Sequence, residues 1–391
     1  MTNIGIFGKR NSGKSSIINS LTEQDLAIVS DIPGTTTDPV KKTVEIFGIG
    51  PVTLIDTAGI DDNSILGNQR VKKTLETIDK IDFAILVISQ LQWTKEDEDL
   101  VSLFKDNGVS FMIVHNKSDI KPLAPELKKL LEDKYQAPMF EYSTLTNEHR
   151  NNFLEAIQIH LPPTKHTKNS MFDGLIKPED IVLLVTPIDS EAPTGRMILP
   201  QMQAVRSLLD NNAIVVDCQV SQISKALQSL NVKPALVVTD SQAFAEVVKL
   251  IPESQKLTSF SILLAKQKGF FEETIQGTKC IENLKDGDKV LILESCTHQT
   301  SCDDIGRVKL PRLLTKYTGK NLQFEFISGL SPLPENIAEY ALAIQCGGCM
   351  VTARQINIRL RRITSAGVPV SNYGMSLAYV NGIFNRSLQP F

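Results

Sequence analysis

Short apolar runs that alternate with segments of helical spacing make up most of the hydrophobic pattern. In the first third of the chain, the runs at 4–7, 52–55 and 111–115 have the length of buried strands, and residues 97–104 and 126–135 place apolar side chains at helical intervals. Strands that alternate with helices are typical of parallel sheets covered by helices. This pattern predicts an α/β fold.

The alternation is interrupted at 161–170, a polar and proline-bearing stretch that predicts a linker. Beyond it the apolar runs form two short series, and each series predicts a small parallel βα domain. We therefore expect three domains, at residues 1–163, 171–262 and 270–391. The strands expected in the two later domains are 180–186, 213–217, 235–239, 289–294, 321–326 and 340–344.

Composition and charge narrow the classes of partner. The chain has 391 residues, of which 42% are hydrophobic, and this is enough for several cores. The formal net charge is −3, so we expect neither nucleic acid nor a membrane as a partner. No apolar run reaches the roughly 18 residues that a spanning helix needs, and the first residues lack the pattern of a signal peptide. We expect a cytoplasmic protein.

A phosphate-binding motif directly follows the first predicted strand. Residues 8–15 read G-K-R-N-S-G-K-S, which matches the G-x-x-x-x-G-K-S loop and leads into a predicted helix. Its glycines let the backbone curl around phosphates, Lys14 can reach the β- and γ-phosphates, and the Ser15 hydroxyl can bind Mg²⁺. The helix that follows directs its positive end at the same anion. The predicted nucleotide-binding residues here are Gly8, Asn11, Ser12, Gly13, Lys14, Ser15 and Ser16.

Two further motifs and a last loop at 143–145 stand at the ends of later strands, in the order that a GTPase needs. Asp56 opens D-T-A-G, where its carboxylate can hold the Mg²⁺ shell and Gly59 can offer its N–H to a γ-phosphate. Residues 116–119 read N-K-S-D, and the carboxylate of Asp119 can accept both N–H groups of a guanine edge. This set indicates GTP. The residues predicted to bind it are Asp56, Gly59, Asn116, Lys117, Asp119, Ser143 and Thr144.

A Pro-, Gly- and Thr-rich segment at 31–39 predicts a loop that could act as a switch. It resembles the P-G-T-T-x-D loop of the TrmE/Era-like GTPases, and this resemblance implies that Thr36 contacts Mg²⁺. Asn11 also matches their G-x-x-N-x-G-K-S loop, which implies that Asn11 helps to hold K⁺. Ile60 stands where Ras-type GTPases carry the Gln that orients water, so the resemblance implies potassium-assisted hydrolysis. A turn role for Asn11 is the alternative. The catalytic residues expected are Lys14, Thr36, Asp56 and Gly59.

The middle part carries no cluster of His, Cys or carboxylate side chains. We therefore expect it to be an assembly platform that self-associates. Cys218 is interpreted as a small buried apolar residue, and His115 and His149 in the first part as solvated histidines.

The remaining cysteines gather in the last third of the chain. Cys296-x-His298 follows one predicted strand and Cys346-x-x-Cys349 follows another, and the carboxyl ends of parallel strands meet at one sheet edge. Thiolates and a histidine can hold zinc in a closed site, and thiolates suit an iron–sulfur cluster. Cysteines without a metal are the third possibility. The candidate metal ligands are Cys296, His298, Cys346 and Cys349.

The order of the three parts, together with C-x-H and C-x-x-C at this spacing, resembles the HydF family of GTPases that mature FeFe-hydrogenase. The resemblance covers essentially the whole chain. It implies a 4Fe-4S cluster on Cys296, Cys346 and Cys349, delivery of a two-iron precursor to apo-hydrogenase, HydE and HydG as partners, and a homodimer through the middle domain. Gln345 stands where the family pattern has His. The fourth ligand stays open between an exchangeable group and His298, Cys302, Asp303 or Asp304.

One rival function also stays open from the sequence. A TrmE/Era-like GTPase in tRNA modification or ribosome assembly, with a structural zinc site, would need a basic face for RNA. The basic cluster of the last third is interpreted instead as a solvated face of a helix predicted at 351–362. This cluster consists of Arg354, Arg359, Arg361 and Arg362.

Overall fold

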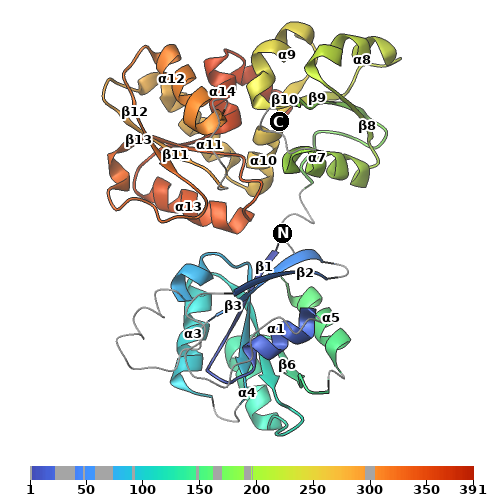
Figure 1. The fold of residues 1–391 in the computed structure, drawn as a ribbon, viewed down its shortest axis with the longest axis vertical. Helices are drawn as coiled ribbons and strands as arrows, with labels where there is room; N and C mark the ends of the chain where they lie inside the picture. The colour runs from blue at the N-terminus through green and yellow to red at the C-terminus, as the bar shows by residue number, and fades with distance from the viewer. Residues whose placement is uncertain are drawn as a thin grey trace. The chain divides into compact units, whose positions relative to one another are not determined.

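The computed structural model divides into two compact units, Met1–Thr164 and Lys165–Phe391, called the first and the second unit below. Each is described by itself (Figure 1). The structure describes residues 2–22, 40–46, 49–57, 74–89, 93–146, 149–161, 170–188, 195, 197–295 and 304–391.

The first unit is built on a six-stranded sheet with the order β2-β3-β1-β4-β5-β6. Strand β2 runs antiparallel to β3, and the other neighbours are parallel. Strand β4 is buried at all six positions, as expected where helices cover both faces of a parallel sheet. The strands are β1 (Thr2–Gly8), β2 (Val40–Ile46), β3 (Gly50–Asp56), β4 (Phe83–Ile88), β5 (Ser110–Asn116) and β6 (Met139–Tyr142), and the helices are α1 (Lys14–Thr22), α3 (Lys95–Asp106), α4 (Pro125–Tyr135) and α5 (Arg150–His160).

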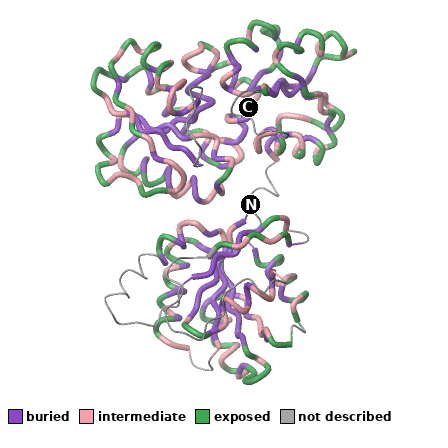
Figure 2. Tube along the Cα trace, viewed as in Figure 1, coloured by how far each residue is buried: buried purple, intermediate pink, exposed green. Residues whose placement is uncertain are grey.

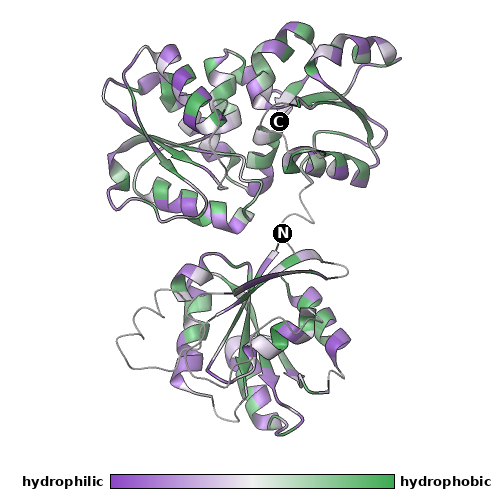
Figure 3. Ribbon diagram, viewed as in Figure 1, coloured by the Kyte–Doolittle hydropathy of each residue, from purple (hydrophilic) through white to green (hydrophobic). Residues whose placement is uncertain are grey.

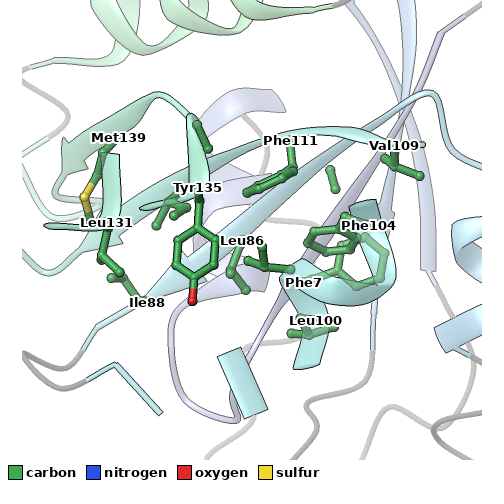
Figure 4. Close-up of a cluster of buried hydrophobic side chains, with 14 of the residues drawn as sticks. Phe7, Leu86, Ile88, Leu100, Phe104, Val109, Phe111, Leu131, Tyr135 and Met139 are labelled. Carbon is green, nitrogen blue, oxygen red and sulfur yellow. The ribbon is translucent and has the colours of Figure 1, made fainter. Parts of the chain in front are cut away.

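Two separate cores cover the two faces of this sheet, and Figures 2 and 3 show its buried, apolar strands between the polar outer surfaces of the helices. The core under α3 and α4 contains a row of aromatic rings (Figure 4). The ring centres of Phe7 and Phe104 are 5.0 Å apart, and those of Phe104 and Phe111 are 5.6 Å apart. Each such buried ring contributes about 1.5–3 kcal/mol through burial alone.

The second unit contains two four-stranded sheets, with the orders β10-β9-β7-β8 and β12-β11-β13-β14. All strand pairs in both sheets are parallel, which confirms the predicted α/β class with two small parallel βα parts. The elements of the first of these sheets are β7 (Ile181–Val185), α7 (Leu199–Asp210), β8 (Ile214–Cys218), η1 (Val220–Gln222), α8 (Ile223–Ser229), β9 (Leu236–Thr239), η2 (Ser241–Ala243), α9 (Phe244–Leu250), β10 (Leu257–Ser259) and α10 (Phe260–Lys268).

The second of these sheets carries the C-terminal half of the unit. A π-helical turn, η4, directly precedes α12. The elements are α11 (Phe271–Lys279), η3 (Cys280–Asn283), β11 (Lys289–Leu293), η4 (Ile305–Lys309), α12 (Leu310–Thr318), β12 (Gln323–Ile327), η5 (Ile337–Glu339), β13 (Tyr340–Gln345), α13 (Ala353–Ser365), β14 (Val370–Asn372), α14 (Tyr373–Val380) and α15 (Phe384–Leu388).

Helix α10 contacts the cores of both sheets of the second unit. Its Leu263 and Leu264 pack in the core that contains α7, whereas Ile262 packs in the core of the C-terminal sheet. The Ser259 hydroxyl caps the start of α10 by accepting the N–H of Ile262, and Gly269 ends the helix at φ +88°. The predicted boundary between 262 and 270 therefore falls within and just after a helix shared by both sheets, and it stays a prediction. None of the described helices is long and apolar enough to cross a membrane.

Candidate nucleotide site and cysteine loop

The loop between β1 and α1 has the shape that the phosphate motif predicts. Gly8 has φ +141° and Gly13 has φ +93°, so both adopt backbone conformations that favour glycine. A Cβ atom on Gly8 would lie 2.2 Å from the carbonyl oxygen of Val87, and one on Gly13 would lie 2.1 Å from Asn116 Nδ2. The two glycines therefore let the loop approach the neighbouring strands closely and leave a backbone cradle.

Lys14 opens α1 and is buried at the base of this cradle. Its Nζ donates to the carbonyl oxygens of Gly8, at 3.0 Å, and of Lys9, at 2.7 Å. These two bonds hold a positive charge within the phosphate loop. Ser12 lies deeper in the same loop, and its buried hydroxyl has no hydrogen-bond partner among the described residues.

Ser15 and Asp56 bring two hard oxygen donors together beside this loop. Ser15 Oγ donates to Asp56 Oδ2 at 2.6 Å, while the buried Asp56 Oδ1 has no hydrogen-bond partner among the described residues. Burial raises the pKa of Asp56, and the hydrogen bond from Ser15 opposes that rise. An orphaned carboxylate oxygen next to a hydroxyl fits Mg²⁺, which prefers such ligands. The predicted partners Thr36 and Gly59 lie outside the described residues.

The N-K-S-D motif follows β5 and contacts the phosphate loop directly. Asn116 Nδ2 donates to the carbonyl oxygen of Ser12 at 3.0 Å, and Lys117 Nζ donates to that of Asn11 at 3.1 Å. Asn11 and Lys117 both adopt positive φ, at +59° and +63°. This arrangement joins the motif expected to read the base to the loop expected to bind the phosphates.

The loop after β6 completes this end of the site. Asn116 of β5 pairs with Tyr142 of β6, so the two strand ends lie side by side. Ser143 Oγ donates to Asp119 Oδ1 at 2.6 Å, which orients the carboxylate expected to bind guanine. Thr144 follows in the turn, and Ser16 lies in the first turn of α1. The structure thus brings together the described members of the predicted GTP site, whose roles stay predictions.

His115 was interpreted from the sequence as solvated, and that interpretation is wrong. It lies on β5, next to Asn116, and its side chain is fully buried. Neither ring nitrogen has a hydrogen-bond partner among the described residues, and burial lowers the pKa of His115. The continuous apolar run at 111–114 was a signal of burial, because a strand inside a parallel sheet is covered on both faces.

Cys346 stands immediately after β13, next to the end of β11. Its backbone N–H donates to the carbonyl oxygen of Leu293 at 2.9 Å, and its Sγ accepts the backbone N–H of Ser295 at 3.1 Å. Ser295 is the last described residue before the predicted ligand Cys296 in the sequence. Cys296, His298, Cys302 and Asp303 themselves lie outside the described residues.

Gln345 occupies the position at which the family pattern has a histidine. Its side chain is buried, and its Nε2 donates to Ser295 Oγ at 2.9 Å and to Cys346 Sγ at 3.4 Å. The Ser295 hydroxyl and Cys346 Sγ are 3.2 Å apart. Gln345 therefore acts as a hydrogen-bond donor to the sulfur, a contact that orients Cys346.

Residues 346–351, called the cysteine loop below, depend on their glycines. Gly348 has φ +68°, and a Cβ there would lie 2.2 Å from Ile356 Cδ1; one on Gly347 would lie 3.2 Å from Leu264 Cδ1 of α10. Cys349 packs against the core that contains α10. Burial raises the pKa of Cys349, the charge of Cys346 raises it further, and the charge of Lys268 lowers it. The glycines thus let the loop lie close against α10 and α13.

Two buried cations, Lys268 and Arg359, stand on α10 and α13, the helices against which this loop lies. Lys268 donates to carbonyl oxygens of the loop, and Arg359 donates to those of Gly329, at 2.6 Å, and Ser331, at 3.3 Å. Burial lowers the pKa of Arg359. The interpretation of the basic cluster as a solvated face is therefore wrong for Arg359, although the rest of the cluster is exposed or half-buried. Arg359 lies one helical turn from Ile356 and Ile363, a spacing that could have indicated its burial.

The other candidate ligands and cysteines have local roles. Asp304 is buried, and its Oδ1 accepts the N–H of Arg307 at 2.7 Å, which caps η4. Cys218 is buried at the end of β8, and burial raises its pKa to about 11, in keeping with its interpretation as an apolar residue. Cys280 Sγ donates to the Gln276 carbonyl at 3.7 Å. Within the described part of the chain, no three His, Cys, Asp or Glu side chains are grouped closely enough to hold a metal.

Three family models match the chain in order. The model described as 50S ribosome-binding GTPase matches residues 3–117, the hydrogen maturase F dimerization domain matches 171–269, and the hydrogen maturase F tetramerization domain matches 253–390. The two hydrogen maturase F models together span more than half of the chain.

Parts of the chain are also similar to known GTPases and to solved structures. GTPase Der of Kosmotoga olearia is 32% identical over 200 residues, which are 49% of this chain and 40% of that protein. The tRNA modification GTPase MnmE of Prochlorococcus marinus is 40% identical over 119 residues, which are 30% of this chain and 25% of that protein. The chain thus spans less than half the length of these relatives. The crystal structure of a GDP·AlF4⁻ complex of Aquifex aeolicus Era is 18% identical, with a TM-score of 0.38, and covers 63% of this chain and 97% of that chain.

Proposed function

The chain belongs to the hydrogen maturase F family, and from this premise we propose that it is a GTPase scaffold for the maturation of FeFe-hydrogenase. It binds a 4Fe-4S cluster, delivers a two-iron precursor to apo-hydrogenase, and uses GTP binding and hydrolysis to gate its contacts with partners. The observation that carries the proposal is the succession of a GTPase model and two hydrogen maturase F models along one chain.

The nucleotide site supports GTP hydrolysis through its arrangement of charges and donors. Lys14 holds a cation inside the phosphate loop, and Ser15 and Asp56 offer the oxygen ligands that Mg²⁺ needs. When bound, Mg²⁺ neutralises charge on the β- and γ-phosphates. Ser143 orients Asp119 for the guanine edge. Thr36 and Gly59 are expected to complete the γ-phosphate end, and Asn11 is expected to hold K⁺.

The cysteine loop supports a cluster through its donor set. Cys346 and Cys349 offer two soft sulfur ligands, and Ser295 and Gln345 donate hydrogen bonds to the first of them. Soft thiolates with such donors suit iron–sulfur ligation. Cys296 is proposed as the third ligand. His298, Cys302, Asp303, Asp304 or an exchangeable group is proposed as the fourth. When bound, a 4Fe-4S cluster supplies iron to which the two-iron precursor can be attached.

The partners follow from the same premise. The matches to dimerization and tetramerization models support self-association, and we propose a homodimer through residues 171–262. HydE, HydG and apo-hydrogenase are the proposed protein partners. Nucleic acid and membranes are not proposed as partners, since the net charge of −3 gives no general attraction to anionic surfaces.

A maturation assay tests this function. The purified chain, incubated with HydE, HydG, their substrates and GTP, is added to apo-hydrogenase, and hydrogen evolution is measured. We expect activation with the wild-type chain and at least a tenfold loss with Cys349→Ser. If apo-hydrogenase becomes equally active with the variant, or without the chain, the scaffold role is wrong. The rival role, a GTPase of tRNA or ribosomes with structural zinc, predicts no activation at all.

A further inference from the structure

Lys268 has an unusual position for a lysine. It is the last residue of α10, its side chain is only 8% exposed, and its Nζ donates to the carbonyl oxygens of Gly348, at 2.9 Å, and Val351. Lysine is almost never fully buried unless its ammonium is paired. These two acceptors belong to the cysteine loop and stand on either side of Cys349 in the sequence.

The backbone around Lys268 is held as firmly as its side chain. Asn357 of α13 donates its Nδ2 to the carbonyl oxygen of Lys268 at 2.8 Å. Gly269 then turns the chain out of α10 with φ +88°. Lys268 therefore ties the end of α10 to the cysteine loop through its side chain and to α13 through its backbone.

We propose that Lys268 is a positioning residue, which clamps the cysteine loop to α10 and places a fixed positive charge beside Cys349. The first part of this proposal needs no metal. The second part rests on the proposed function, because it concerns a cluster held by these cysteines. A nearby cation favours the more negative, reduced form of an iron–sulfur cluster and so raises its reduction potential.

The clamp also connects two parts of the second unit. Helix α10 packs against α7 through Leu263 and Leu264, and it reaches the cysteine loop through Lys268. A displacement of α10 relative to the C-terminal sheet would therefore pull directly on the carbonyl groups next to Cys349. In this way the clamp couples the cysteine loop to the packing of α10 against α7 and the sheet β10-β9-β7-β8.

The test uses the full chain with Lys268→Met, which removes the charge and both hydrogen bonds, and Lys268→Gln, which removes the charge but keeps N–H donors. Lys266→Met is the matched control. Lys266 lies two residues away on α10 and donates to the carbonyl oxygen of Asp173 at 2.7 Å, away from the cysteine loop. Iron and sulfide are first counted in the anaerobically purified wild type. The cluster potential is then titrated, and hydrogen exchange of residues 347–351 is measured in the apo protein.

We expect both Lys268 variants to reduce the ratio of reduced to oxidised cluster at least tenfold at a fixed potential, a shift of about 59 mV for one electron. Lys268→Met should also speed exchange in the loop at least tenfold, Lys268→Gln should speed it less, and Lys266→Met should change neither quantity. If Lys268→Met does not fold, the reduction potential measured for Lys268→Gln alone tests the effect of the Lys268 charge. Unchanged potential and exchange would overturn the proposal. A wild type that is purified without iron would instead refute the proposed function. The hydrogen-exchange rates alone would then test whether Lys268 holds the cysteine loop against α10.

Discussion

Replacing Arg307 by methionine should destabilise the second unit by about 2–3 kcal/mol. Glu294 follows β11, and its side chain is only 5% exposed. Arg307 Nε and Nη2 reach its carboxylate at 3.1 and 2.9 Å, and Ser328 Oγ donates to it at 2.7 Å. Methionine would leave this buried carboxylate with the serine but without its cation.

The magnitude follows from the burial of the two partners. Removing one member of a buried ion pair costs about 3–5 kcal/mol. The Arg307 side chain is 35% exposed, so solvent screens part of the interaction, and we take a value below that range, about 2–3 kcal/mol. For a unit of this size, the loss corresponds to a fall in melting temperature of about 4–12 °C.

The assay is urea denaturation followed by circular dichroism, with the single Trp of the chain as an internal control. Trp93 lies in the first unit, where its ring packs on Tyr135 with the centres 5.2 Å apart, so its fluorescence reports that unit alone. Arg307→Met should shift the dichroism transition of the second unit and leave the fluorescence transition unchanged. The double variant Arg307→Met/Glu294→Gln, which removes the stranded charge, should recover at least half of the loss. A loss below about 0.5 kcal/mol, or no recovery in the double variant, would refute the reasoning.

Three further predictions concern the first unit. Burial lowers the pKa of His115 below its ordinary value of 6.5, so below that pH the unfolded chain takes up a proton that the folded chain excludes. The free energy of unfolding of the first unit, followed by Trp93 fluorescence, should therefore fall as the pH drops below 6.5. His115→Met should weaken this dependence on pH, and an unchanged dependence would show that His115 is not its cause. Gly13→Ala would place a Cβ 2.1 Å from Asn116 Nδ2, so the affinity for GTP, measured by calorimetry, should fall at least tenfold. An affinity equal to that of the wild type would contradict the role of Gly13 in shaping the phosphate loop. Exchanging K⁺ for Na⁺ should lower GTP turnover severalfold, whereas an unchanged rate would leave Asn11 with a turn role.

The features that the sequence predicts well are local in the chain. The phosphate loop spans residues 8–15, and its glycine spacing is enough to predict both the turn and the strand and helix beside it. The parallel βα parts follow in the same way from short apolar runs separated by helical segments. The position of Cys346 directly after a strand is also as predicted, because the apolar run at 340–344 indicates where that strand ends.

The features that the sequence missed depend on residues far apart in the chain. One donor to Cys346 Sγ is Ser295, 51 positions away, and one carbonyl partner of Lys268 is Gly348, 80 positions away. No local sequence pattern indicates a contact between residues so far apart in the chain. Arg359 was missed for another reason, because a basic side chain was given a solvated role without regard to its position on the apolar face of α13.

The most direct test of the account counts metals in the anaerobically purified chain. We expect about four iron atoms and four acid-labile sulfides per chain, and little zinc. Cys346→Ser and Cys349→Ser should each lose most of that iron while keeping GTPase activity, since the nucleotide site lies in the other unit. One zinc per chain without iron would contradict the central claim and favour a structural metal site.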